Sequence, residues 1–122
     1  MSNGKSVMVL DDEPIVGDRL KEALEKEGFE VETFTESPAA IARLQTRSFD
    51  VLVTDMKMRG PSGMDVLRLV KETSPSTHVL VITGYATIET NREAQILGAD
   101  HFIAKPFKTK DLVKLVAKAA RG

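Results

Sequence analysis

The sequence predicts an α/β fold with a doubly wound, five-stranded parallel sheet and five helices. Short apolar runs rich in valine, isoleucine and leucine recur five times, and stretches with helical periodicity lie between them. Three of these runs are nearly continuous rather than alternating, which is typical of strands buried on both faces of a parallel sheet. The expected strands are residues 7–10, 30–34, 50–54, 78–82 and 101–104.

Composition limits the class of protein. The chain has 122 residues, 42% of them hydrophobic and 29% charged, which is typical of one soluble domain. A net charge of -1 excludes binding of nucleic acid through bulk positive charge, and the lack of cysteine excludes disulfides and thiolate metal sites. We find no membrane-length apolar run and no signal peptide, and therefore expect a cytoplasmic protein without a membrane partner.

The helices are justified by their end signals. Pro14 is a favoured first-turn residue and Gly28 a left-handed cap, so the first helix lies between them. The second helix begins at Ser37-Pro38 and runs through Leu44. Ser62 and Asp65 have capping-box spacing at the start of the third helix, which Ser74-Pro75 ends.

The last two helices are expected at residues 87–97, closed by Gly98, and 109–120, where Asp111 and later lysines follow the helix dipole. The fourth helix carries only a thin inner stripe of Ile88, Ala94 and Leu97. We therefore expect it to be weakly held, so that it is mobile or its polar face meets a partner.

Chemistry is expected where the strands end, because ligands of open parallel sheets bind beyond the carboxyl ends of the strands. Asp11-Asp12-Glu13 follows the first run, and the later runs are followed by Asp55, Thr83 and Lys105. Crowded carboxylates repel one another, and a hard cation such as Mg²⁺ relieves the repulsion.

We expect Asp12 and Asp55 to bind Mg²⁺ directly and Asp11 to act through water. Asp55 can then act as a nucleophile on phosphorus, because it alone ends the central run VLVTD. The metal, Lys105 and the Thr83 hydroxyl would each hold one phosphoryl oxygen. Glu13 is expected only to favour the helix dipole.

Four segments, VMVLDDE, LVTDMKMRGPSGMDVL, VLVITGYAT and DHFIAKPF, resemble the signature blocks of the response regulator receiver domain, the phospho-acceptor module of two-component signalling. The resemblance covers nearly the whole chain. It implies a flavodoxin-like fold with strand order 2-1-3-4-5. One departure is Arg59 after Met58, where the family usually has proline.

The resemblance also implies specific roles. Asp55 would be the phosphorylation site, and Asp11, Asp12 and the backbone carbonyl of Lys57 would bind Mg²⁺. Thr83 would be the switch hydroxyl, and Lys105 would precede a cis peptide bond to Pro106.

Three further side chains have two readings each. Phe102 is either the switch aromatic or plain core. Lys57 and Tyr85 either tune the lifetime of the phosphoryl group, as those positions do in the family, or are simply exposed.

The resemblance implies a switch rather than a metabolic enzyme. A sensor histidine kinase would donate the phosphoryl group, and the face of the fourth helix, fifth strand and fifth helix would signal to an output domain, a protein partner or a second copy. Residues 1–122 form one receiver domain, either free-standing or the N-terminal part of a longer protein. Two alternatives remain open: a Mg²⁺-dependent aspartyl-phosphate phosphohydrolase, disfavoured because Lys57 replaces its second acid, and a phosphorylation-independent interaction module.

Overall fold

The computed structural model describes residues 4–56, 58 and 61–121. This part of the chain contains five strands and five helices in strict alternation. The strands are β1 (Ser6–Leu10), β2 (Glu30–Phe34), β3 (Val51–Asp55), β4 (His78–Thr83) and β5 (His101–Ala104). The helices are α1 (Pro14–Lys26), α2 (Ser37–Leu44), α3 (Gly63–Thr73), α4 (Ile88–Ile96) and α5 (Thr109–Ala120).

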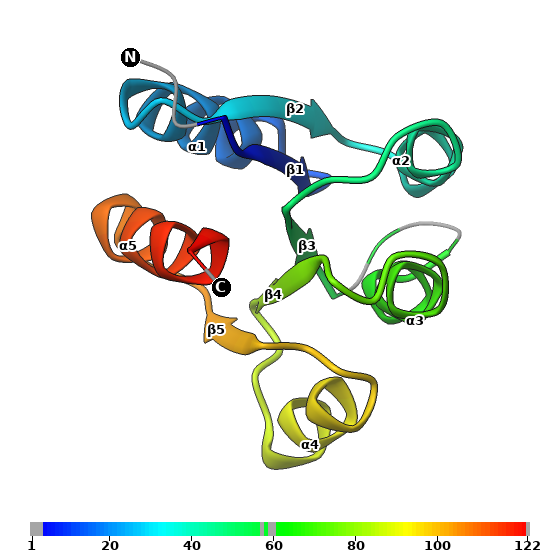
Figure 1. Ribbon diagram of the computed structural model, residues 1–122. Helices are drawn as coiled ribbons and strands as arrows, with labels where there is room; N and C mark the ends of the chain where they lie inside the picture. The colour runs from blue at the N-terminus through cyan, green and yellow to red at the C-terminus, as the bar shows by residue number, and fades with distance from the viewer. Residues whose placement is uncertain (1–3, 57, 59–60, 122) are drawn as a thin grey trace.

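The strands form one parallel sheet in the order β2-β1-β3-β4-β5, which confirms the predicted fold class and strand order. Helices α1 and α5 cover one face of the sheet, and α2, α3 and α4 cover the other (Figure 1). None of the described helices is both long enough and apolar enough to cross a lipid bilayer.

The apolar runs form strands because both of their faces are buried. In β1, Val7 and Val9 pack in the core beneath α1 and α5, whereas Met8 and Leu10 pack in the core beneath α2, α3 and α4. This alternation follows from the two-residue period of a strand. The near-continuous apolar composition of the inner strands is thus explained by helices on both sides.

The helix ends agree with their sequence signals. Gly28 and Gly98 have φ angles of 90° and 101°, a left-handed conformation that glycine adopts without strain. Ser62 and Asp65 form the predicted capping box at the start of α3. Helix α5 has Asp111 in its first turn and Lys118 in its last, in agreement with the helix dipole.

Several expected element boundaries differ from the structure by one residue, and two of these differences affect the site. Asp55 and Thr83 are the last residues of β3 and β4 rather than the first residues after them, and they pair in register with Ile82 and Ala104. Both residues are therefore held by a strand and buried, with whole-residue exposed fractions of 7% for Asp55 and 0% for Thr83.

The expected inner stripe of α4 was wrong at Ile88. Ile88 is 75% exposed, because Ala94 follows it by six positions, about one and two-thirds helical turns, which places the two on different faces. Ala94 is the buried residue of this helix, and Leu97 is half-buried. The side-chain oxygen Oδ1 of Asn91 is buried without a hydrogen-bond partner among the described residues.

Gly63 lets α3 approach the end of β3 closely. Its N–H donates to the carbonyl oxygen of Met56 at 2.9 Å. A Cβ atom at this position would overlap the carbonyl oxygen of Asp55 and lie 2.9 Å from the Cα atom of Met56. Helix α3 therefore buttresses the backbone of Asp55 only because residue 63 has no side chain.

Gly63→Ala is expected to lower the free energy of unfolding by about 3 kcal/mol or more, because the backbone of Asp55 cannot move aside without disturbing the sheet. Gly84→Ala is the matched control, since a Cβ there meets nothing within 4 Å, and its effect should stay within about 0.5 kcal/mol. Urea unfolding measures both changes. Equal stability of the two variants would contradict the close approach.

Helix α4 is expected to exchange its amide hydrogens through openings of lower free energy than α5, because it buries little and leaves a polar oxygen unsatisfied. Asn91→Leu should slow exchange in residues 88–96, whereas Gln95→Leu on the exposed side should not. Native-state hydrogen exchange measures both effects. Equal protection of α4 and α5 in the unmodified chain would overturn this expectation.

Candidate functional site

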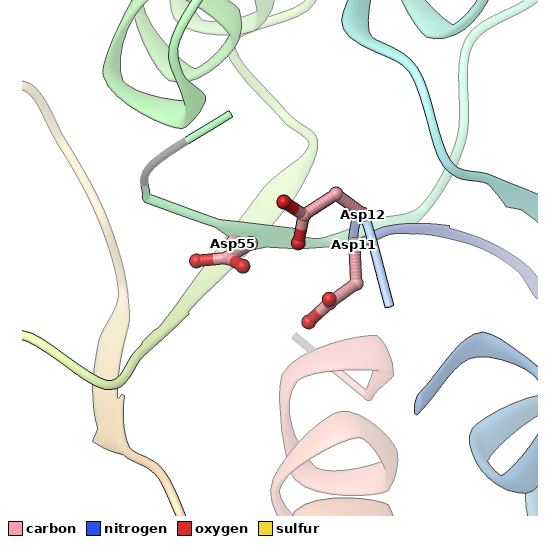
Figure 2. Close-up of side chains that lie close together, drawn as sticks. All are labelled: Asp11, Asp12 and Asp55. Carbon is pink, nitrogen blue, oxygen red and sulfur yellow. The ribbon is translucent and has the colours of Figure 1, made fainter. Parts of the chain in front are cut away.

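Three aspartates meet at the carboxyl edge of two neighbouring strands. Asp11 and Asp12 directly follow β1, and Asp55 ends β3, which pairs with β1 along its length. One carboxylate oxygen of each residue lies within 4.8 Å of the others. Figure 2 shows the three carboxylates converging on a common space from these two segments.

Burial disfavours the ionised form of a carboxyl group in this cluster. Asp11 is 1% exposed, whereas Asp12 lies at the surface. Burial raises the pKa of the Asp11 carboxyl above its ordinary value; the Lys105 ammonium and a hydrogen bond from the Glu13 N–H oppose this rise, and the nearby charge of Asp55 adds to it. A neighbouring positive charge therefore stabilises the ionised form of Asp11.

Lys105 supplies that charge from the end of β5. Its Nζ lies 2.8 Å from Oδ2 of Asp11, and 3.2 Å from both Oδ2 of Asp55 and Oε1 of Glu13. Burial disfavours the ammonium form, but attraction to Asp11 and Asp55 outweighs it and raises the pKa of Lys105 above its ordinary value. Lys105 is thus a charged group that faces three carboxylates.

The backbone around Lys105 fixes this position. Its N–H donates to the carbonyl oxygen of Thr83 at 2.7 Å, which ties the end of β5 to the end of β4. The peptide bond from Lys105 to Pro106 is cis. Sequence reasoning placed Lys105 at this edge but treated Glu13 as a helix-dipole residue and missed its contact with the ammonium.

The carboxylates fit a hard divalent cation. Oδ2 of Asp11 is fully buried; its short contact with Lys105 is an ion pair rather than a well-directed hydrogen bond. An oxygen in this state can still accept a ligand, and carboxylate oxygens are the donors that Mg²⁺ prefers. Asp11, Asp12 and Asp55 therefore form a cluster that could bind a metal ion. Lys57, expected to add its backbone carbonyl, lies outside the described residues.

Thr83 is linked to the start of α4 through a single backbone residue. Its Oγ1 accepts a hydrogen bond from the N–H of Tyr85 at 2.9 Å, and the Tyr85 carbonyl accepts one from Oγ1 of Thr90 at 3.1 Å. Thr90 also forms a capping box with Thr87, the N-cap of α4. Sequence reasoning did not identify Thr90, although its three-residue spacing from Thr87 was the available signal.

The two candidate aromatic residues lie in different environments. Phe102 in β5 pairs with Val81 and packs, half-buried, against the core beneath α2, α3 and α4. The side chain of Tyr85 is 61% exposed. The site therefore presents an ammonium and a hydroxyl beside a carboxylate cluster, an arrangement that can bind an anion and a cation side by side.

Comparison with known proteins places this geometry in a family. The family described as response regulator receiver domain matches residues 7–117. The probable transcriptional regulatory protein TcrX of Mycobacterium tuberculosis is 32% identical over 88% of this chain and 46% of its own length. The acid tolerance regulatory protein ActR of Rhizobium meliloti is 34% identical over 89% of this chain and 56% of its own length.

The backbone supports the same assignment. A CheY-like response regulator receiver domain protein from Methanospirillum hungatei JF-1 superposes with a TM-score of 0.91 at 27% identity, over 96% of this chain and 94% of that one. The chain spans about half the length of the curated relatives it matches. On the family match, the parallel sheet and the relatives together, the chain belongs to the response regulator receiver domain family of two-component signalling.

Proposed function

We propose that Asp55 accepts a phosphoryl group from the phosphohistidine of a sensor histidine kinase and that this reaction switches the surface of α4, β5 and α5. The observation that carries the proposal is the meeting of Asp11, Asp12 and Asp55 with the Lys105 ammonium at one edge of the sheet. Family membership supports phosphoryl acceptance as the reaction.

In the proposed transfer, an oxygen of the Asp55 carboxylate attacks phosphorus in line with the bond to the imidazole nitrogen. The new P–O bond forms as the P–N bond breaks, and the electron pair of that bond returns to the imidazole. Lys105, already 3.2 Å from Oδ2 of Asp55, would hold one phosphoryl oxygen. Hydrolysis by water would later restore the carboxylate.

Asp11, Asp12 and Asp55 would hold Mg²⁺, with the backbone carbonyl of Lys57 as a further ligand. When bound, the ion supplies positive charge that offsets the carboxylates and the oxygens of the transferring group. The ammonium of Lys105 neutralises the same carboxylates before the ion arrives. The domain would therefore act as its own phosphorylation catalyst without being a metabolic enzyme.

The switch would begin when the Thr83 hydroxyl turns toward the phosphoryl group and leaves the Tyr85 N–H. Because the Thr90 hydroxyl donates a hydrogen bond to the carbonyl oxygen of Tyr85, a movement of Tyr85 would also move the first turn of α4. Phe102 would adjust on the same face of the sheet, and Lys57 and Tyr85 would tune the lifetime of the phosphoryl group.

The surface of α4 suits a partner that binds after this change. Ile88 and Ile96 are 75% and 77% exposed, and Tyr85 lies close by in the loop before the helix. Apolar side chains of this size gathered on one helix favour a protein partner. We propose an output domain, a downstream protein or a second phosphorylated copy as the partner, and a cytoplasmic location for this protein.

A groove beside Lys105 suits the kinase. It has a volume of 390 Å³ and lies between α1 and the segment after β5, with Ile15, Val16, Pro106 and Phe107 among its lining residues. Ile15 is 55% exposed there. We propose that an apolar side chain from the kinase helix that carries the phosphohistidine docks in this groove and brings the phosphoryl group to Asp55.

Two alternatives use the same residues. An aspartyl-phosphate phosphohydrolase would share the nucleophile and the metal, but position 57 carries lysine instead of its second acid. A phosphorylation-independent interaction module would keep the fold without the reaction. We propose that residues 1–122 form one receiver domain, because the family match covers residues 7–117 without interruption.

Asp55→Asn is expected to abolish phosphoryl uptake from acetyl phosphate with Mg²⁺, because an amide nitrogen replaces one nucleophilic carboxylate oxygen. Gel retardation of the phosphorylated chain measures the loss. Asp18→Asn, at an exposed position of α1, is the control and should react normally. Full phosphoryl uptake by Asp55→Asn would rule out Asp55 as the acceptor. Release of phosphate from small phosphoesters by the unmodified chain would favour the phosphohydrolase. No phosphoryl uptake by the unmodified chain would favour the interaction module.

Ile15→Glu is expected to slow transfer from a phosphorylated histidine kinase about tenfold or more, because it places a charge in an apolar docking contact. Phosphorylation by acetyl phosphate should change less than about twofold, since this small donor needs no docking surface. Ile96→Glu, at an isoleucine of α4 that is also exposed, should transfer at the normal rate. Equal slowing with both donors would place the defect at Asp55 rather than in docking.

A further inference from the structure

Glu13 shares the ammonium of Lys105 with the acceptor site. Oε1 of Glu13 lies 3.2 Å from Nζ, the same distance that separates Nζ from Oδ2 of Asp55. The two carboxylates differ in environment, because the side chain of Glu13 is 61% exposed and that of Asp55 is 9% exposed. Lys105 thus has one partner at the rim of the cluster and two partners inside it.

The position of Glu13 is fixed by the site itself. It is the N-cap residue of α1, and its N–H donates to Oδ1 of Asp11 at 2.9 Å. The backbone of Glu13 is therefore tied to the carboxylate whose other oxygen pairs with Lys105 at 2.8 Å. A movement of the Asp11 carboxylate would therefore shift the backbone of Glu13, the other carboxylate that contacts the ammonium from the start of α1.

Metal binding and Lys105 would compete for the same two carboxylates, those of Asp11 and Asp55. Asp11 and Asp55 pair with the ammonium, and both belong to the carboxylate cluster that could hold a cation. Two positive charges cannot share these carboxylates closely without repulsion. When Asp11 binds a divalent cation, Lys105 must give up its contact with Asp11. The ammonium then needs another anionic partner that the Lys105 side chain can reach.

We propose that Glu13 is a positioning residue that receives the Lys105 ammonium when Asp11 binds a divalent cation and keeps it beside Asp55. This inference rests on the proposed function, because it takes Asp11, Asp12 and Asp55 as the metal ligands. Glu13 already contacts Nζ at 3.2 Å, so the transfer needs only the loss of the Asp11 contact. The ammonium stays near the acceptor and repels the cation less than it would on Asp11.

Glu13→Gln is expected to weaken Mg²⁺ binding about two- to fivefold, the range that an exposed ion pair supplies. Without the charge of Glu13, the ammonium remains on Asp11 and Asp55 and competes more strongly with the cation. Glu36→Gln is the matched control: Glu36 is also exposed and is the N-cap residue of the neighbouring helix α2. Its Mg²⁺ affinity should equal that of the unmodified chain.

A double-mutant cycle separates positioning from simple charge attraction. Mg²⁺ affinity is measured by calorimetry in 150 mM salt for the unmodified chain, Glu13→Gln, Lys105→Met and the double variant. If Glu13 acts through Lys105, its replacement weakens Mg²⁺ binding only while Lys105 is present. Equal weakening in both backgrounds, or no weakening at all, would overturn the proposal.

The two levels of inference fail differently. If the unmodified chain takes up phosphoryl from acetyl phosphate but Glu13→Gln binds Mg²⁺ as tightly, the positioning role fails and the proposed function stands. If the cycle gives the expected coupling but no phosphoryl adduct forms on Asp55, the positioning role stands and the acceptor function fails. A chain that binds no Mg²⁺ would remove the metal assignment and the positioning role together.

Discussion

The ion pairs of Lys105 are the interaction on which the candidate site depends. Parallel strands bring Asp11 and Asp55 to one edge of the sheet, where both carboxylates are largely buried and repel each other. An ammonium 2.8 Å from one and 3.2 Å from the other offsets this repulsion. The same fold therefore assembles a cluster of negative charge and supplies the cation that stabilises it.

Much of the chain helps to hold the strand ends that carry these aspartates in place. Two apolar cores hold β1 and β3 in register from both faces, and Gly63 lets α3 press against the backbone of Asp55. The rest of the edge is less buried. Thr83 and Thr90 both form hydrogen bonds with the backbone of Tyr85, and α4 buries little of its own surface. A buried acceptor beside a helix that buries little surface suits a conformational switch.

Much of the fold was readable from the sequence because its elements have strong local signals. Short apolar runs located the five strands, and glycine, proline and capping residues located the helix ends to within about two residues. The exposure of Ile88 was misjudged because α4 has few apolar side chains, so its inner face could not be fixed by periodicity. The ends of β3 and β4 were placed one residue early, since polar Asp55 and Thr83 do not look like strand residues.

The site was predicted in outline because strand ends meet at one edge, a rule that needs no side-chain detail. The contact between Glu13 and Lys105 could not be predicted, since the two residues lie 92 positions apart and their meeting depends on how the chain leaves β1 and β5. The hydrogen bonds of Thr83 and Thr90 with Tyr85 likewise depend on a turn whose shape the sequence does not specify. Site residues that stand at strand ends can be predicted from the sequence, whereas contacts that depend on the conformation of a loop require coordinates.

A structure determined with beryllofluoride and Mg²⁺ tests the central claim most directly, because beryllofluoride imitates a phosphoryl group on a carboxylate. The account predicts beryllium bonded to Asp55, with Mg²⁺ on the carboxylates of the cluster and Nζ of Lys105 within hydrogen-bond distance of a fluorine. An adduct on another residue, or a Lys105 side chain directed away from the adduct, would contradict it.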